Sequence, residues 1–189
     1  QKTYFQEYGY LPYKCVLSDE ELEALRQRSE DIIEGRLTHV PPRYIQFEAA
    51  FRDGQGIDTH RLDTVRKMTH LCYFDDLFQA VAKKPEIVDV IEDLLGTNIK
   101  FYTDQLMMKP RYNGTVTDWH QDSPAWPFFV PQNHVSCWVA LDDATVENGC
   151  MTIIPGSHKW GPVASEYKQK FLANSEIPHP VPVELKAGH

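Results

Sequence analysis

The 189-residue sequence contains no run of apolar residues close to the roughly 20 that a membrane-spanning helix needs. It also has no excess of basic charge. Its formal net charge is −8, so its overall charge does not attract a nucleic acid backbone. The first residues lack the basic-then-apolar order of a secretory signal. We therefore expect a soluble, cytoplasmic protein that binds neither nucleic acid nor membranes.

Cysteine is scarce as well. The four cysteines, Cys15, Cys72, Cys137 and Cys150, are widely separated, and no two of them form a C-x-x-C pair. This spacing favours reduced thiols over a disulfide framework and argues against a zinc site made of paired cysteines. With 42% hydrophobic residues the chain can bury one core, so we expect residues 1–189 to form a single domain.

The first half of the sequence carries signals for helices. Ser18 and Glu21 form a capping box ahead of an apolar stripe, and Gly35 follows as a stop. Pro85 and Gly96 mark the start and the end of a second amphipathic segment. The predicted elements are a strand-like segment over 8–16, a helix over 19–34, an irregular segment over 36–63, and helices over 75–82 and 85–95.

From residue 99 onward the pattern is typical of strands, with β-branched and aromatic residues between turn signals. The predicted strands are 99–109, 134–141 and 150–154, and the predicted turns are 110–114, 148–149 and 155–156. Helices followed by antiparallel strands favour an α+β protein whose core is a sandwich or a barrel.

The segment Trp119-His120-Gln121-Asp122 is the most informative for chemistry. In an extended backbone, residues i and i+2 point to the same face, so His120 and Asp122 could converge on one ion. A histidine and a carboxylate form one edge of the facial triad that binds non-haem iron, and a second histidine completes it. Taken alone, an H-x-D tripeptide is also typical of an ordinary polar strand end.

The sequence around this motif resembles the phytanoyl-CoA dioxygenase family of iron(II)- and 2-oxoglutarate-dependent oxygenases. Residues 117–158 keep the order of its H-Q-D segment, its W-x-A-L-D strand, its N-G-C turn and its P-G-S-H turn. Residues 65–110 add a V-x-K segment, a P-E-I helix and an M-x-K-P strand end. The resemblance implies a double-stranded β-helix core (jelly roll, cupin-like) with flanking N-terminal helices.

The resemblance also implies roles for individual residues. His120 and Asp122 would be catalytic iron ligands, and Lys67 and Trp138 match positions that contact 2-oxoglutarate. Gln105, on the strand before the metal motif, is a further candidate for binding this co-substrate. Other roles remain open: Trp138 as a core aromatic, Lys67 as a solvated lysine and Gln105 as a polar position on a half-exposed strand.

The family's second iron-binding histidine and its 2-oxoglutarate-binding arginine lie downstream of a segment that resembles residues 183–188. We therefore expect a C-terminally incomplete domain that lacks its last strands, because a jelly roll ending here would leave long unpaired edges. Within the sequence, His134 and His158 are alternative third ligands, although His158 follows a turn and fits a structural cap better. His189 is not assigned.

The expected reaction is hydroxylation of an unactivated carbon in a small molecule or acyl thioester, with O2 as oxidant and 2-oxoglutarate converted to succinate. Halogenating relatives have a small residue in place of the carboxylate, so Asp122 favours hydroxylation. Four aromatic residues near the motif are candidates for the substrate pocket or for the core: Trp119, Trp126, Phe128 and Phe129. A non-catalytic binding module and a zinc hydrolase are the alternatives, although no H-E-x-x-H signature is present. The sequence carries no signal of oligomeric state.

Overall fold

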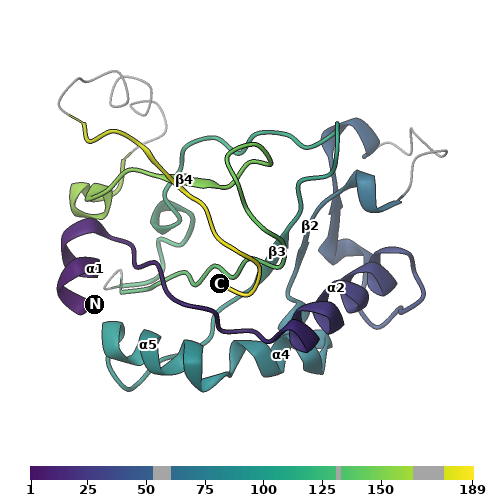
Figure 1. The fold of residues 1–189 in the computed structure, drawn as a ribbon, viewed down its shortest axis with the longest axis horizontal. Helices are drawn as coiled ribbons and strands as arrows, with labels where there is room; N and C mark the ends of the chain where they lie inside the picture. Colours follow the sequence, from purple (N-terminus) through teal and green to yellow (C-terminus); the bar gives the residue numbers. More distant parts are fainter. Residues whose placement is uncertain (53–60, 131–132, 164–176) are drawn as a thin grey trace.

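The computed structural model describes residues 1–52, 61–130, 133–163 and 177–189. Helices α2, α4 and α5 lie along one side of the molecule, and the strands lie beyond them (Figure 1). The helices are α1 Lys2–Tyr8, α2 Asp19–Ile33, α3 Leu71–Phe74, α4 Asp76–Ala82 and α5 Pro85–Leu95. The strands are β1 Ile45–Phe47, β2 Val65–Thr69, β3 Gln105–Met107, β4 Met151–Ile153 and β5 Val181–Val183.

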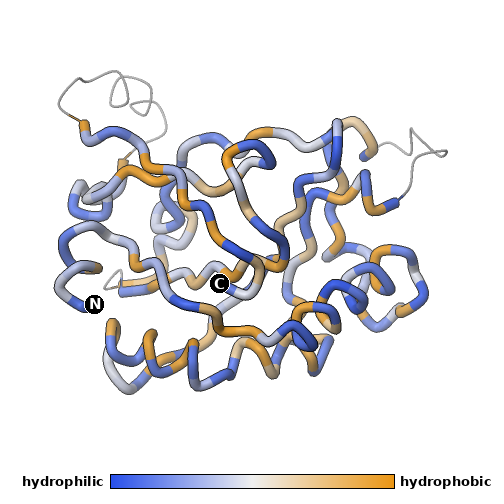
Figure 2. The backbone as a smooth tube through the Cα atoms, viewed as in Figure 1, coloured by the Kyte–Doolittle hydropathy of each residue, from blue (hydrophilic) through white to orange (hydrophobic). Residues whose placement is uncertain are grey.

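The three predicted helices are confirmed as α2, α4 and α5. At the start of α2 the Ser18 hydroxyl accepts from the Glu21 N–H, and the Glu21 carboxylate accepts from the Ser18 N–H. These two bonds satisfy N–H groups that the first turn leaves free. Hydrophobic and hydrophilic residues alternate along these helices (Figure 2), so each helix can bury one side.

Two short helices, α1 and α3, and three strands, β1, β2 and β5, were not predicted. The strand-like segment expected over 8–16 is wrong: α1 ends at Tyr8, where Gly9 adopts a left-handed φ of 80° and its N–H donates to Phe5. The residues after it pair with no strand among the described residues. Helix α3 and strand β1 are too short to show a sequence period. Residues 53–60 of the segment expected to be irregular lie outside the described residues.

Strands β1, β2 and β3 form an antiparallel sheet in that order. Met68 pairs with Ile45 on one side and Leu106 on the other, and this face packs on a core that includes Ile32 and Ile33 of α2. The predicted strand over 99–109 is shortened to β3, because its partner β2 ends where the chain turns into α3. One face of the sheet is therefore closed by α2, and the opposite face is not part of this core.

The second sheet consists of β4 and β5. Strand β4 and the turns on either side of it, at Asn148-Gly149 and at Pro155-Gly156, are confirmed. The strand predicted over 134–141 is wrong. Within the described residues only Ala140 of this segment makes backbone hydrogen bonds, with Gly188 and His189. A strand needs a partner along its whole length, and β-propensity alone does not supply one.

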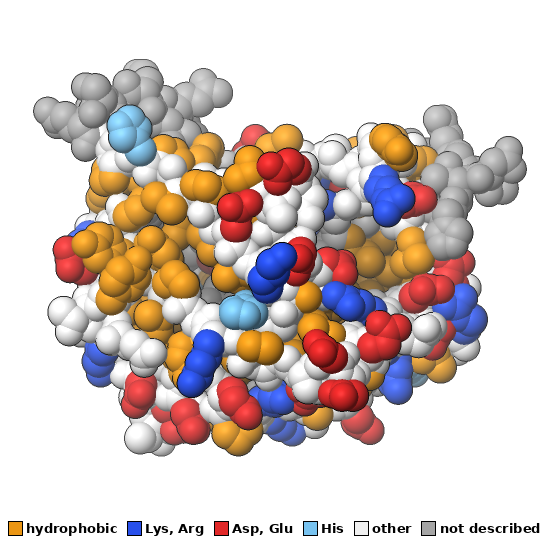
Figure 3. Space-filling model, in the orientation of Figure 1, with side chains coloured by type: hydrophobic (Ala, Val, Ile, Leu, Met, Phe, Trp, Pro, Cys, Tyr) orange, Lys and Arg blue, Asp and Glu red, His pale blue; other side chains and the backbone are white. Residues whose placement is uncertain are grey.

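A second core joins the N-terminal half of α2 to α4. Leu22 and Leu25 pack against Leu77 and Val81 of α4, and Val139 and Leu141 complete the cluster. Exposed apolar side chains gather instead on the side that carries α1 and the β4–β5 pair (Figure 3). In the part of the chain that the structure describes, no helix combines the length and apolar character needed to cross a membrane.

Candidate metal site

The side chains of His120 and Asp122 point toward each other from an irregular segment after the Pro110–Gly114 turn. Their Nε2 and Oδ1 atoms are 3.6 Å apart, and both side chains are about half exposed, at 54% and 42%. Asp122 precedes a short 3-10 turn over Ser123–Ala125, where Pro124 fixes the chain direction. The i, i+2 spacing therefore brings the two groups together, as the sequence predicts.

The hydrogen bond of His120 determines which ring nitrogen is free. Its Nδ1 lies 2.8 Å from the backbone oxygen of Asp118. A carbonyl oxygen can only accept, so Nδ1 carries a proton, and in the tautomer that binds a metal Nε2 presents its lone pair. This is the arrangement that orients histidines as metal ligands.

The Nε2 lone pair and the Asp122 carboxylate are both acceptors, so a cation between them satisfies both. Two adjacent ligand atoms that each lie about 2.1 Å from one metal ion are about 3.0 Å apart, so the observed 3.6 Å requires only a small movement of the two side chains. The pair therefore fits two positions of a divalent metal. Across the described ranges, no cluster of three or more His, Cys, Asp or Glu residues is suited to holding a metal ion.

Two residues that the sequence did not single out hold the motif in place. The Ser136 hydroxyl donates to Asp122 Oδ2 at 3.0 Å. The Gln121 amide donates to the Gly161 oxygen at 3.1 Å and accepts from the Val163 N–H at 2.8 Å. The i, i+1 alternation could have indicated Gln121, because a residue between two convergent side chains points the other way.

Lys67 and Gln105 lie on the same face of the first sheet. Thr69 pairs directly with Gln105 and is two residues from Lys67, so all three side chains project to one side. This face is opposite to Met68, which is fully buried in the core. Both candidates for 2-oxoglutarate binding therefore lie on the face of the sheet that points away from the first core.

Trp138 belongs to the extended segment that also supplies Ser136. Its neighbours Val139 and Leu141 pack against the second core, and Ser136 donates to Asp122. The Trp138 side chain is 38% exposed, which does not fit a purely structural core aromatic.

Three of the four aromatic candidates, Trp126, Phe128 and Phe129, form a cluster with Tyr102 and His134. The Tyr102 ring lies 5.5 Å from Trp126, 5.9 Å from Phe128 and 4.8 Å from Phe129, measured between centroids. Phe128 is 62% exposed, so the cluster has an open side. The cluster therefore forms an aromatic wall directly after the His-x-Asp motif.

The other histidines considered as ligands have different contacts. His134 Nε2 lies 3.3 Å from the Ser123 hydroxyl, and its ring packs against Trp126. His158 Nε2 lies 3.1 Å from the Gln6 oxygen, so this ring links the turn after β4 to α1, as expected of a structural residue. The structure thus brings neither ring to the His120–Asp122 pair.

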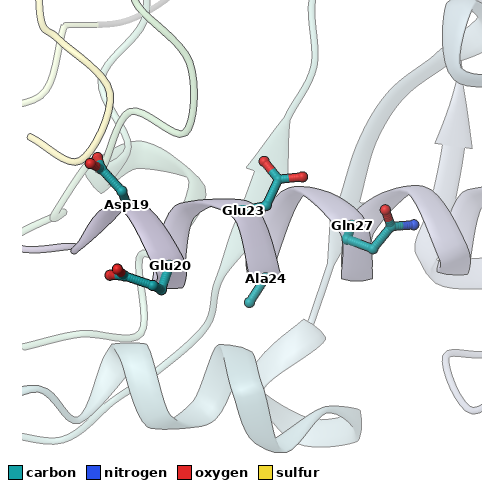
Figure 4. A pocket seen from close by; sticks show the side chains of 5 residues that line it. All are labelled: Asp19, Glu20, Glu23, Ala24 and Gln27. Carbon is teal, nitrogen blue, oxygen red and sulfur yellow. The ribbon is translucent and has the colours of Figure 1, made fainter.

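A surface hollow lies elsewhere, along α2 (Figure 4). Asp19 and Glu23 project to one side of the helix and Glu20 to the other, so the acidic side chains do not converge on one point. The hollow is lined by one helix only. It therefore offers no alternative metal site.

The fold has close counterparts among solved structures. EctD from S. alaskensis with 2-oxoglutarate and 5-hydroxyectoine superposes with a TM-score of 0.74 at 19% identity, covering 99% of this chain and 64% of that chain. EctD with bound Fe gives a TM-score of 0.73 at 18% identity, with the same coverage. The protein therefore has the mixed fold of helices and antiparallel strands found in EctD.

The sequence comparisons define the family. The family model "Phytanoyl-CoA dioxygenase (PhyH)" matches residues 5–189, and the chain belongs to this family. A probable phytanoyl-CoA dioxygenase from Caenorhabditis elegans is 30% identical over 181 residues, which cover 88% of this chain and 54% of that protein. The L-proline trans-4-hydroxylase of Streptomyces griseoviridis is 31% identical over 182 residues, covering 94% and 62%. The chain thus spans a little over half the length of these relatives.

Proposed function

We propose that this protein is an iron(II)- and 2-oxoglutarate-dependent dioxygenase that hydroxylates a carbon of a small molecule or acyl thioester. The observation that carries the proposal is the convergence of His120 Nε2 and the Asp122 carboxylate, whose nearest atoms are 3.6 Å apart. Family membership supports the same reaction class, because the relatives include an L-proline trans-4-hydroxylase and ectoine dioxygenases. We further propose that residues 1–189 belong to one domain with a double-stranded β-helix core.

In this proposal His120 and Asp122 hold the iron. Activation of O2, coupled to decarboxylation of 2-oxoglutarate to succinate, is the chemistry that bound iron(II) supplies. The Nδ1–H of His120 donates to the Asp118 oxygen, which leaves Nε2 available to the metal. The Ser136 hydroxyl neutralises part of the charge on the outer carboxylate oxygen and fixes its orientation.

Lys67, Gln105 and Trp138 bind the co-substrate. The Lys67 ammonium can pair with a carboxylate of 2-oxoglutarate, and the Gln105 amide can donate to an oxygen from the same sheet face. Trp138 provides a flat apolar surface that limits water at the site. The wall of Tyr102, Trp126, Phe128 and Phe129 is suited to enclose an apolar part of the substrate.

The test is turnover of 2-oxoglutarate. The purified protein is incubated with iron(II), 2-oxoglutarate and O2 against a panel of acyl thioesters and amino acids, and succinate is measured. The proposal predicts succinate formation that depends on iron and is stimulated by one class of substrate. Iron binding without succinate from any substrate would instead favour a non-catalytic binding protein. Hydrolysis of a thioester by the zinc-loaded protein, without succinate, would favour a hydrolase.

A further inference from the structure

Glu48 is a buried carboxylate that the proposed reaction does not use. Its residue exposure is only 2%, and it directly follows β1. One oxygen accepts from the Thr115 N–H at 3.3 Å, and the other accepts from the Thr115 hydroxyl at 2.7 Å and from Arg66 Nη1 at 3.3 Å. Burying an ion costs free energy unless such partners surround it. The three hydrogen bonds that Glu48 accepts offset this cost.

These partners keep Glu48 ionised. Burial by itself raises the pKa of Glu48, but the hydrogen bonds from Thr115 and the charge of Arg66 outweigh burial and hold the pKa below its ordinary value. Glu48 is therefore a full carboxylate at neutral pH, and both of its oxygens act only as acceptors.

A β-bulge places Arg66 where it can reach this carboxylate. Along the β1–β2 ladder Gln46 pairs with Lys67 and Phe47 pairs with Val65, so Arg66 has no partner on β1. A bulge of this kind re-aims one side chain and is common beside functional sites. Arg66 Nη1 also contacts the Thr115 hydroxyl, and Nη2 donates to the Thr117 hydroxyl at 3.3 Å.

Residues 115–121, which lead into the metal motif, depend on such side-chain contacts. Among the described residues, no backbone-to-backbone hydrogen bond involves this segment. It is exposed almost throughout and forms no helix or strand. Its upstream end is held by Glu48 and Arg66, and its downstream end by the amide of Gln121. A metal site needs its ligands held within a fraction of an ångström. These contacts therefore help to determine the positions of His120 and Asp122.

We propose that Glu48 and Arg66 form a positioning pair that fixes the metal-bearing segment against β2. Because Arg66 directly precedes Lys67, the pair sets where His120 and Asp122 lie relative to the strand that carries a co-substrate ligand. This inference rests on the proposed function, and it adds two residues that touch neither metal nor substrate. Glu48 and Arg66 act through Thr115 and Thr117.

The decisive variant is Glu48→Gln, which keeps the shape of the side chain. A glutamine has one acceptor oxygen, so its NH2 group would face either the Thr115 N–H or Arg66, which are both donors. Loss of a residue that orients metal ligands typically weakens metal binding roughly 10- to 100-fold. We expect Glu48→Gln to weaken iron(II) binding to this extent and to raise the KM for 2-oxoglutarate.

Two further variants separate positioning from folding. Thr115→Val removes the hydroxyl between Glu48 and Arg66 at an exposed position and keeps the backbone N–H. Asp75→Asn is the matched control, because Asp75 is also a buried carboxylate bound to an arginine, Arg28, but it caps α4 in the helical layer. We expect Thr115→Val to weaken iron(II) binding, and Asp75→Asn to lower the melting temperature and leave iron(II) affinity unchanged.

The measurements are iron(II) affinity, by anaerobic competition with a chromophoric chelator, and kcat and KM for 2-oxoglutarate. Weaker iron(II) binding in Glu48→Gln but not in Asp75→Asn supports the positioning pair. Wild-type affinity in Glu48→Gln, or equal weakening in Asp75→Asn, overturns it. If Glu48→Gln does not fold, Thr115→Val decides alone by the same criterion. If the wild-type protein itself binds no iron(II), the proposed function fails and the inference fails with it.

Discussion

Residues 1–98, the helical region, and residues 99–189, the site region, are held together in different ways. Within the described ranges, every buried hydrophobic residue except Ala140 and Ile154 lies in the helical region, and so do all the buried polar residues. The helical region supplies all the buried residues of both cores, and the site region adds only partly buried side chains such as Leu106 and Val139. The site region contains the His120–Asp122 pair and exposes large side chains such as Tyr112, Phe128 and Trp138.

This difference shows where stability and chemistry are located in the molecule. The helical region is stabilised by apolar burial, which is strong and not directional. The motif in the site region is fixed by individual hydrogen bonds, which Ser136 donates to Asp122, Gln121 donates to Gly161, and Thr115 donates to Glu48. Substitutions in the two regions should therefore affect different measurements, and three predictions test this.

The largest effect is expected for Asp122→Gly. The Asp122 side chain is 42% exposed, so its removal should leave the free energy of unfolding nearly unchanged, but it removes one of two proposed iron ligands. We expect hydroxylation to be lost, measured as substrate-dependent succinate formation. Asp142→Gly, at a side chain that is 84% exposed, is the control and should retain activity. Strong activity in Asp122→Gly would exclude this residue as a ligand.

The next effect concerns stability. Ile33 is completely buried in the first core, and Ile33→Ala should lower the free energy of unfolding by about 2–5 kcal/mol through lost burial and a residual cavity. The matched change in the site region is Met151→Ala, at a residue that is 41% exposed, where we expect a change of no more than about 0.5 kcal/mol. Urea denaturation of both variants checks the comparison, and equal losses would contradict it.

The smallest effect depends on pH. Burial opposes the ionisation of Asp75, but bonds from Arg28, His39 and the Leu77 N–H outweigh burial and lower its pKa. A carboxylate with a lowered folded-state pKa stabilises fully above its unfolded-state pKa of about 3.9, and this stabilisation is lost as the pH falls through the folded-state value.

Asp75→Asn should therefore cost about 1–3 kcal/mol at pH 7 and progressively less below pH ~4, measured by urea denaturation across pH. A difference between the two proteins that stays constant down to acidic pH would show that the charge of Asp75 contributes no stability.

The sequence predicted the elements whose signals are local. The capping box at Ser18 and the Pro85 and Gly96 boundaries placed α2 and α5 correctly. The sequence-based prediction failed where a strand forms only if a distant segment pairs with it. Residues 134–141 have strand-forming composition but pair only at Ala140 in the described structure, and β1 forms in an irregular stretch because β2 lies beside it.

In the candidate site, too, the residues with a local signal were predictable and those that depend on long-range contacts were not. The H-x-D spacing predicted that His120 and Asp122 could converge in an extended backbone, and the structure brings them together on an irregular segment instead. Glu48 could not be predicted, because it is 67 residues from its partner Thr115 and nothing in the nearby sequence indicates that it is buried. Contacts of this range appear only once the chain has folded.

The most direct test of the central proposal is anaerobic addition of iron(II) and 2-oxoglutarate, followed by visible absorption spectroscopy. We expect the full-length native protein to develop the weak charge-transfer band of 2-oxoglutarate chelated to iron(II), and its His120→Ala variant to remain folded and develop none. A full-length native protein without the band, or a band of equal strength in His120→Ala, would contradict an iron site built on His120 and Asp122.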